Sequence, residues 1–294
     1  MLAILVSSLR GGGAEQVALN LAGEFSRRGM RVDLVLVSAE GPLLEQVPKG
    51  VRIIDLGSSR ARSAIRKFRA YLKREKPASV IAVAFQNNLL AAIATLGLRK
   101  RPRLVLSVHS TASRAISAHG FFKRLWLSWG AHLFYRRADA VVAVSEGAAD
   151  DLSLEWGLDR RKITTIYNPV VQKSADSLAQ DKVDMSALNP NGWPLVVSAG
   201  RLTEAKDYPT LLAAAKLVLA KRKVRFLILG EGELRSELEQ LLCEYDIAED
   251  VSFLGWKSNP YPFYTAADVF VMSSAWEGFG NALVEAMARG TPVI

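Results

Sequence analysis

Short apolar runs alternate with amphipathic segments along almost the whole chain, and this alternation restricts the possible folds more than any other feature. Runs such as LAILVSS (2–8), VDLVLVS (32–38) and SVIAVAF (79–85) have the length and composition of buried strands. The segments between them, such as 14–28, carry apolar residues at helical spacing. Parallel sheets with crossover helices have this pattern. The sequence therefore predicts an α/β fold, in which parallel sheets carry helices on both faces.

One interruption divides the alternation into two parts. The stretch at 172–192 is polar, irregular and poor in apolar periodicity, and strands and helices resume with WPLVVSAG (193–200). We predict a first domain over residues 1–172, a linker over 173–192 and a second domain over 193–294. Each domain is expected to be Rossmann-like.

The end of the sequence bears on this division. Gly290, Thr291 and Pro292 stop a helix and start a strand, TPVI (291–294), which ends with the sequence. A strand without a covering helix is a poor place for a domain to end, so we expect the second domain to be incomplete at its C-terminus. A short edge strand at a genuine end is the alternative.

Composition excludes several classes of protein. The single cysteine, Cys243, rules out a disulfide framework and favours a reducing compartment. His109, His119 and His132 do not lie at metal-ligand spacing with carboxylates, so we expect no metal site. The chain has no apolar run of the ~18 residues that a spanning helix needs, and its N-terminus lacks the features of a signal peptide. We therefore expect a cytoplasmic protein.

The charge of the chain is unevenly distributed. Residues 1–175 hold 27 lysines and arginines against 13 acidic residues, a net charge of +14, whereas residues 176–294 hold 11 against 16, a net charge of −5. A basic half could meet nucleic acid, an anionic membrane surface or a phosphorylated substrate. The chain carries no recognised nucleic-acid-binding motif and its second half is acidic, so we expect no nucleic-acid partner.

A glycine-rich loop follows the first predicted strand. Gly11, Gly12 and Gly13 precede the first helix, where glycines let the main chain approach a ligand and the helix N-terminus offers N–H groups to an anion. Their spacing matches neither a dinucleotide-binding fingerprint nor a P-loop. A tight turn that needs positive φ explains the glycines equally well.

Two cations follow the strand predicted at 195–199. Ligands gather at the carboxyl ends of strands in open α/β sheets, and Arg201 and Lys206 would suit phosphate oxygens there. The alternative is a solvated loop in which these cations pair with Glu204 and Asp207.

The strongest group of candidate residues lies in EGFGNALVE (277–285). Glu277 follows a predicted strand, and Glu285 lies on the next predicted helix. The turn between them contains Gly278, Phe279, Gly280 and Asn281. A bound polyol could donate hydrogen bonds to both carboxylates while phosphates meet N–H groups of the turn. The alternative places Glu285 at the positive end of the helix dipole and treats Glu277 as a loop charge.

These motifs together resemble those of a known family. They are, in order, GGGAE in the first loop, SVHS (107–110), VVAVSEG (141–147), YNPV (167–170), GRLTEAKDYPTLLAAA (200–215), ILGEGELRSELE (228–239), FLGW (253–256) and EGFGNALVEAMARGTPVI (277–294). The chain is similar to the retaining, nucleotide-sugar-dependent glycosyltransferases with an E-x7-E motif (glycosyltransferase family 4, glycosyl transferases group 1). The resemblance covers essentially the whole chain and implies the GT-B fold of two facing Rossmann-like domains.

The resemblance implies roles for the candidate residues of the second domain. Arg201 and Lys206 match the basic pair that holds the diphosphate of the sugar donor. Glu277 matches the acid that contacts the transferred sugar, and Glu285 matches the acid that binds the ribose hydroxyls. The turn from Gly278 to Asn281 matches the one that meets the sugar donor with main-chain N–H groups.

Residues of the first domain are also implied. Gly12 and Gly13 match the loop that closes over the sugar donor, and His109 matches a histidine near the sugar. Taken without the resemblance, His109 at the end of a strand is equally a structural histidine with satisfied hydrogen bonds.

The resemblance further implies a hexosyltransferase that uses a UDP- or GDP-sugar and retains the anomeric configuration. No metal or other cofactor is expected, because two cations and helix N-termini can stabilise the charge of the leaving diphosphate. The acceptor would be a glycan or a lipid-linked sugar in cell-surface polysaccharide or lipopolysaccharide synthesis. It would bind the first, basic domain, and the nucleotide-sugar donor would bind the second domain. Missing loops beyond residue 294 would leave the activity of this chain in doubt.

A segment rich in aromatic and basic residues raises the question of membrane contact. Residues 121–137 contain Phe121, Phe122, Lys123, Arg124, Trp126, Trp129, Phe134, Arg136 and Arg137. Such a segment could dock on anionic lipid at the inner face of the plasma membrane, and burial between domains explains its aromatic residues as well.

Two other functions fit the same architecture. A sugar-nucleotide epimerase with the GT-B fold is one alternative, and a non-catalytic fragment that binds nucleotide is the other. Hydrolysis of the sugar donor in the absence of an acceptor would distinguish a transferase from a fragment that only binds.

Overall fold

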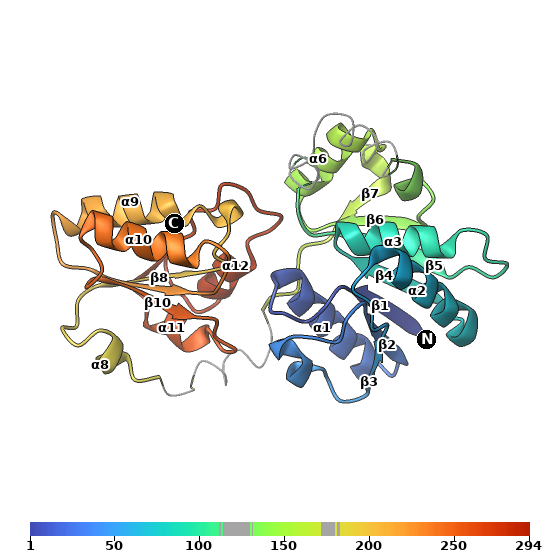
Figure 1. The fold of residues 1–294 in the computed structure, drawn as a ribbon, viewed down its shortest axis with the longest axis horizontal. Helices are drawn as coiled ribbons and strands as arrows, with labels where there is room; N and C mark the ends of the chain where they lie inside the picture. The colour runs from blue at the N-terminus through green and yellow to red at the C-terminus, as the bar shows by residue number, and fades with distance from the viewer. Residues whose placement is uncertain (112, 114–129, 131, 172–179, 181–182) are drawn as a thin grey trace. The chain divides into compact units, whose positions relative to one another are not determined.

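The computed structural model describes residues 1–111, 113, 130, 132–171, 180 and 183–294, and these residues form two compact units, Met1–Pro169 and Val170–Ile294 (Figure 1). Both units are α/β structures with parallel sheets, so the predicted fold class is confirmed. In the first unit a seven-stranded sheet has the order β3-β2-β1-β4-β5-β6-β7. Its strands are β1 (Leu2–Val6), β2 (Val32–Leu36), β3 (Val51–Asp55), β4 (Ser79–Val83), β5 (Arg103–Val108), β6 (Ala140–Ala143) and β7 (Ile163–Thr165).

Helices cover both faces of this sheet because alternate residues of each strand point to opposite faces. In β1, Ala3 and Leu5 belong to a core shared with α2, α3 and α6, whereas Ile4 and Val6 belong to a core shared with α1. The helical segments of the first unit are α1 (Gly13–Arg27), η1 (Pro42–Gln46), α2 (Ala61–Glu75), α3 (Phe85–Thr95), α6 (Glu146–Trp156) and η2 (Arg160–Lys162).

The second unit repeats the same winding on a smaller scale. Its four-stranded sheet has the order β10-β9-β8-β11, with strands β8 (Leu195–Ala199), β9 (Arg225–Leu229), β10 (Val251–Gly255) and β11 (Val269–Phe270). One core lies against α9 and α10, and the other against α11 and α12. The helical segments are α8 (Met185–Leu188), η3 (Glu204–Lys206), α9 (Tyr208–Leu219), α10 (Arg235–Tyr245), α11 (Tyr261–Ala266) and α12 (Asn281–Met287).

The strand order fixes where ligands can bind. In both sheets the first strand of the unit lies in the interior, with the second strand on one side and the fourth on the other. The order therefore reverses between β1 and β4 in the first unit and between β8 and β11 in the second. Open α/β sheets bind ligands at the carboxyl ends of the strands beside such a reversal.

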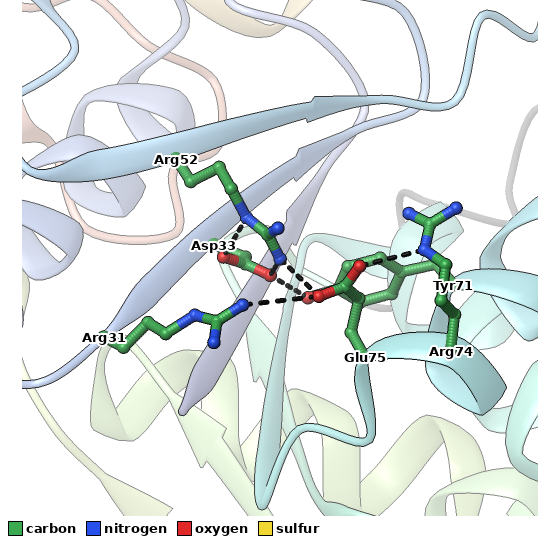
Figure 2. A network of polar contacts seen from close by, with 6 residues as sticks. All are labelled: Arg31, Asp33, Arg52, Tyr71, Arg74 and Glu75. Atoms are coloured by element: carbon green, nitrogen blue, oxygen red, sulfur yellow. Dashed lines mark hydrogen bonds and ion pairs between the residues drawn. The ribbon is translucent and has the colours of Figure 1, made fainter.

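At the amino ends of the first strands, a network of charged side chains ties α2 to the sheet (Figure 2). Asp33 is fully buried and accepts hydrogen bonds from Arg52 at 2.9 and 2.6 Å and from the Tyr71 hydroxyl at 2.7 Å. Arg52 also reaches Glu75 at 2.6 Å. Asp33 and Arg52 are direct partners in the register of β2 and β3. The buried carboxylate is thus fully paired, as its burial requires.

Several elements differ from the sequence-based expectation. The apolar run 79–85 was predicted as one strand, but β4 ends at Val83 and α3 begins at Phe85. The reason is Ala84, whose φ of +73° turns the chain sharply. Helix α6 was not predicted, and α8 lies in the stretch that was expected to be irregular.

Most of the aromatic and basic segment 121–137 lies outside the described residues, as do His119 and much of the predicted linker. Within its described part, Phe134 packs against the first core and Arg136 and Arg137 are exposed. At the other end of the chain, the predicted strand 291–294 runs beside β11, where Phe270 and Val293 form a parallel bridge.

Candidate functional site

Two loops at the carboxyl edge of the second sheet contain most of the predicted site. The loop from β8 to α9 contains Arg201 and Lys206, and the loop from β11 to α12 contains Glu277 and the turn to Asn281. Because β8 and β11 are neighbours at the reversal of strand order, these loops meet where an open α/β sheet binds ligands.

Lys206 and Glu277 form an ion pair between the two loops. The Nζ atom of Lys206 contacts Oε1 of Glu277, and Ser274 donates its hydroxyl to the same oxygen at 2.9 Å. The two charged side chains are 21% and 27% exposed. In the described part of the chain, neither Arg201 nor Lys206 forms an ion pair with Glu204 or Asp207. Lys206 pairs with Glu277 instead, so it is not the solvated loop cation of the alternative interpretation.

Main-chain contacts hold the same two loops together. Ser273 donates its hydroxyl to the carbonyl oxygen of Lys206 at 2.8 Å, and the Ala275 N–H donates to the carbonyl oxygen of Ala205 at 3.0 Å. Ser273 and Ala275 therefore hold the main chain of Ala205 and Lys206, while Ser274, between them, holds the side chain of Glu277. These contacts set the position of the cation relative to the carboxylate.

Glycines permit a close approach of two loops next to this pair. A Cβ atom at Gly230, whose φ is +140°, would lie 1.9 Å from the carbonyl oxygen of Gly200. A Cβ atom at Gly200 would lie 3.1 Å from Cε of Lys206. The absence of side chains at these positions lets Lys206 fold back over the end of β8.

Glu285 lies half-buried on α12, beside the buried tyrosine Tyr264. The Tyr264 hydroxyl approaches Oε2 of Glu285 at 3.4 Å. Burial raises the pKa of Glu285 to about 7, and the weak hydrogen bond from Tyr264 offsets only part of this rise. A carboxyl group with too few partners for its ionised form is a candidate for ligand binding.

The turn before α12 depends on a left-handed glycine. Gly280 caps the helix with φ of +81° and ψ of +56°, and a Cβ atom there would lie 2.9 Å from Cε of Met272. The chain therefore turns from Glu277 into the helix that carries Glu285 within a few residues. Arg201, at the opposite loop, is exposed and makes no ion pair among the described residues.

Three of the predicted residues belong to the first unit. Gly12 caps α1 and Gly13 begins it, but Oε2 of Glu15 already accepts the N–H groups of Gly11 at 2.8 Å and of Gly12 at 3.0 Å. An acidic side chain in the first helical turn satisfies main-chain donors in this way. An anion could use the Gly12 N–H only by displacing the carboxylate of Glu15.

His109 follows β5, and its ring is hydrogen-bonded to a residue of the same strand. Ser107 Oγ lies 2.9 Å from His109 Nε2, while Nδ1 is buried and has no hydrogen-bond partner among the described residues. Burial lowers the pKa of His109 to about 4, so the ring is neutral at physiological pH.

The structure adds residues that the sequence analysis did not single out. Ser273 and Ser274 position Lys206 and Glu277, Tyr264 lies beside Glu285, and Ser107 contacts His109. Ser273 and Ser274 lie a few residues before Glu277, and Ser107 lies two residues before His109. The closeness of these residues in the sequence could have suggested both contacts. The contact of Tyr264 required the tertiary structure.

Two further findings concern metals and membranes. In the described ranges, no three histidine, cysteine, aspartate or glutamate side chains gather closely enough to hold a metal ion. None of the described helices has both the length and the apolar character needed to cross a bilayer.

Comparison with known protein families shows which family the chain belongs to. Residues 11–172 match the family described as Glycosyltransferase Family 4, and residues 180–294 match Glycosyl transferases group 1. The chain belongs to glycosyltransferase family 4. In this family 4 chain, one family description matches most of the first unit and the other matches most of the second. The motifs in the sequence predicted these same two families.

Two relatives of this family 4 chain are named glycosyltransferases of bacteria. It is 35% identical over 162 residues to the lipopolysaccharide core biosynthesis glycosyltransferase LpsE of Rhizobium meliloti, a match that covers 55% of this chain and 45% of the relative. It is 27% identical over 305 residues to an N-acetylgalactosaminyltransferase of Campylobacter jejuni that acts on a diphospho-undecaprenol substrate, covering 100% of this chain and 80% of the relative.

The fold also matches solved structures. HepE of Anabaena in complex with UDP-glucose superposes with a TM-score of 0.78 at 22% identity, covering 99% of this chain and 79% of HepE. This likeness establishes the fold that the two share. The match with LpsE spans less than half of the length of that relative.

Proposed function

We propose that this protein is a retaining hexosyltransferase that moves a sugar from a UDP- or GDP-sugar to a hydroxyl of a glycan or lipid-linked acceptor. Membership of glycosyltransferase family 4 supports the transferase, and HepE, which has the same fold, was solved with UDP-glucose. The relatives LpsE and the Campylobacter enzyme support a place in cell-surface polysaccharide or lipopolysaccharide synthesis.

The sugar donor is proposed to bind at the carboxyl edge of the second sheet. Arg201 and Lys206 would hold the diphosphate, Glu277 would contact the transferred sugar, and Glu285 would accept hydrogen bonds from the ribose. The turn from Gly278 to Asn281 would meet the donor with its main chain. In the first unit, roles in donor binding are proposed for Gly12 and Gly13, toward the diphosphate, and for His109, toward the sugar.

The observation that supports this proposal most is the ion pair between Lys206 and Glu277. A cation proposed for the diphosphate and an acid proposed for the sugar are therefore adjacent, as the sugar and the diphosphate are in the donor. When the bond between sugar and diphosphate breaks, negative charge develops on the leaving oxygens. Lys206 and the exposed guanidinium of Arg201 would stabilise that charge.

Retention and the lack of a cofactor are parts of the same proposal. The acceptor would attack from the face that the diphosphate leaves, with Glu277 as a ligand of the sugar hydroxyls and not as a covalent nucleophile. Cationic side chains supply the charge stabilisation that a divalent ion supplies elsewhere, so we propose that no metal is needed. The reaction would occur in the cytoplasm, with contact at the inner face of the plasma membrane wherever the acceptor is lipid-linked.

Calorimetric titration of the full chain with UDP, GDP and ADP, in buffer containing EDTA, tests this proposal. We expect one nucleotide to bind selectively, because a shaped pocket distinguishes bases. Glu285→Ala is expected to weaken that binding about tenfold or more, the loss of a charge-assisted hydrogen bond of about 1.5–3 kcal/mol. The matched control Glu237→Ala removes an exposed acid from α10 and should bind as the wild type does.

Two outcomes would contradict the proposal. Equal binding of all three nucleotides, unaffected by Glu285→Ala, would show that the site is wrongly assigned. Selective binding that appears only when a divalent cation replaces the EDTA would refute the metal-independent site. Release of sugar from the bound donor then distinguishes a transferase from a protein that only binds.

A further inference from the structure

The outer face of α2 and the loop from α3 to β5 carry a group of cations without ion-pair partners. Residues 60–76 contain one acid, Glu75, which three arginines already surround (Figure 2), and residues 96–104 contain none. The exposed cations that form no ion pair with any described residue are Arg60, Arg62, Arg66, Lys67, Lys73, Lys76, Arg99, Lys100 and Arg103. We call this group the α2 surface.

Contacts within the first unit bring the two segments together. Helix α2 packs against α3, and Nη1 of Arg69 donates to the carbonyl oxygens of Ala94 at 2.9 Å and of Leu96 at the end of α3. After α2, the carbonyl oxygen of Ala78 accepts the Arg103 N–H at 2.9 Å. The loop before β5 therefore lies beside α2, and its cations extend the basic face of the helix.

The cations oppose the stability of the helix that carries them. Arg60 is the N-cap of α2 and Arg62 lies in its first turn, which contains no acid. Cations at the N-terminus of a helix interact unfavourably with the helix dipole. Arg62 and Arg66 are four residues apart, as are Arg69 and Lys73, and like charges at this spacing repel each other. The stability of the helix therefore does not explain these cations, whereas a polyanionic partner would offset their repulsion.

A cavity of about 230 Å³ adjoins the α2 surface where α3 ends. Leu96, whose carbonyl oxygen binds Arg69 of α2, is one of its lining residues. Leu98 adds to the apolar wall, and Arg101 and Arg137 line the same space. Arg137 is exposed and forms no ion pair in the described ranges. Apolar walls beside guanidinium groups suit a molecule in which a phosphate is joined to a hydrocarbon part.

The side chains around the cations favour lipid over nucleic acid as the polyanion. Phe68 and Tyr71 are the aromatic residues of 60–76 and 96–104, and both are buried. The α2 surface therefore offers no exposed ring on which the bases of a single strand would stack. A leaflet that contains anionic phospholipid presents a plane of negative charge, which attracts clustered lysines and arginines without any need for stacking.

We propose that the α2 surface docks this protein on anionic phospholipid, and that the cavity beside it holds the phosphate of one headgroup. The proposal rests on the proposed function, of which membrane contact is a part, and it assigns that contact to α2 and the loop before β5 instead of 121–137. Helix α2 runs from the carboxyl end of β3 to the amino end of β4. Contact along its outer face thus leaves the carboxyl edge of the sheet open to substrates.

Co-sedimentation of the full chain with vesicles tests the proposal. We expect binding to vesicles of mixed phosphatidylglycerol and phosphatidylcholine, weakening as salt rises, and none to phosphatidylcholine alone. The triple variant Arg62→Gln, Arg66→Gln, Lys73→Gln should bind the mixed vesicles about a hundredfold more weakly, because each cation near an anionic surface contributes about fivefold. Glutamine has a similar helix propensity, and like charges are removed, so this variant should melt no lower than the wild type.

The matched control loses the same net charge elsewhere in the chain. Lys49, Lys221 and Arg222 are exposed cations outside the α2 surface, and their replacement by glutamine should leave vesicle binding close to that of the wild type. A second pair of variants tests the cavity. Arg137→Gln should weaken vesicle binding more than Arg136→Gln, because Arg136 is exposed but does not line the cavity.

Three results would overturn the proposal. One is the absence of wild-type binding to the mixed vesicles, and another is an equal loss in the two triple variants, which would make overall charge the cause. The third is retention of single-stranded RNA by the α2 surface at a salt concentration that releases the vesicles. Equal effects of Arg137→Gln and Arg136→Gln would contradict the headgroup site. Nucleotide titration decides the proposed function separately, so selective nucleotide binding without vesicle binding would contradict this inference alone.

Discussion

At the scale of single residues, Glu285, which we propose as a ligand of the ribose, carries a charge that opposes stability. The carboxyl group is half-buried on α12 and is contacted by the Tyr264 hydroxyl at 3.4 Å, a long hydrogen bond. Burial accordingly raises its pKa to about 7. Between pH 4.5 and 7 the unfolded chain ionises this group before the folded chain does, so folded-state stability falls as pH rises through this interval and stays reduced above it.

Glu285→Gln should therefore stabilise the protein at high pH and have little effect at low pH. If the buried charge costs about 1 kcal/mol, the melting temperature at pH 8 should rise by about 2–4 °C relative to wild type. At pH 4 the two proteins should melt alike, because Glu285 is then protonated in both the folded and the unfolded states. Scanning calorimetry at the two pH values makes the comparison, and a stabilisation that is equal at both would contradict the assigned pKa.

Other residues of the candidate site were found from the sequence only in part. The sequence identified Lys206 and Glu277, because each follows a predicted strand and carries a charge. It could not show that they pair with each other, since 71 positions separate them and only the parallel order of β8 and β11 brings their loops together. Serine is common in loops, so the sequence alone does not reveal that Ser274 donates a hydrogen bond to Glu277.

At the scale of elements, the network at the amino edge shows what joins α2 to the sheet. Asp33 is fully buried and Arg52 is its only cationic partner among the described residues, whereas Glu75 has three arginines around it (Figure 2). Removing one partner of a buried charge leaves the other without compensation. The effect should be large at Arg52 and small at the exposed Arg74.

Arg52→Met should lower the free energy of unfolding by about 3 kcal/mol, because Asp33 is left buried with only the Tyr71 hydroxyl. Arg74→Met, which removes an exposed partner of Glu75, should cost less than about 1 kcal/mol. Urea unfolding of the full chain measures both. Equal losses in the two variants would show that Asp33 does not depend on Arg52.

Elements with strong periodicity were predicted well and the weakly amphipathic ones were not. The runs predicted as strands at 2–8 and 32–38 contain β1 and β2. Helix α6 was missed because small and acidic residues occupy much of its length, and its signals are the cap at Ser145 and the left-handed Gly157. The early start of α3 depends on Ala84 with φ of +73°, a conformation that no sequence pattern predicts for alanine.

At the scale of the whole molecule, two units with the same winding carry opposite net charges. The first, basic part of the sequence contains the proposed acceptor side, and the second, acidic part contains Lys206 and Arg201. The net negative charge of the second part would repel an anion. If a diphosphate binds at the carboxyl edge of its sheet, that binding therefore depends on Arg201 and Lys206.

Titration of the full chain and of Lys206→Met with the nucleotide diphosphate that binds best is the most direct test of this account. Lys221→Met, which removes an exposed lysine from the same unit, is the matched control. We expect Lys206→Met to bind at least about tenfold more weakly, a loss of about 1.4 kcal/mol, and Lys221→Met to bind as the wild type does. Unchanged binding by a folded Lys206→Met protein would contradict it, because the diphosphate would then lie elsewhere.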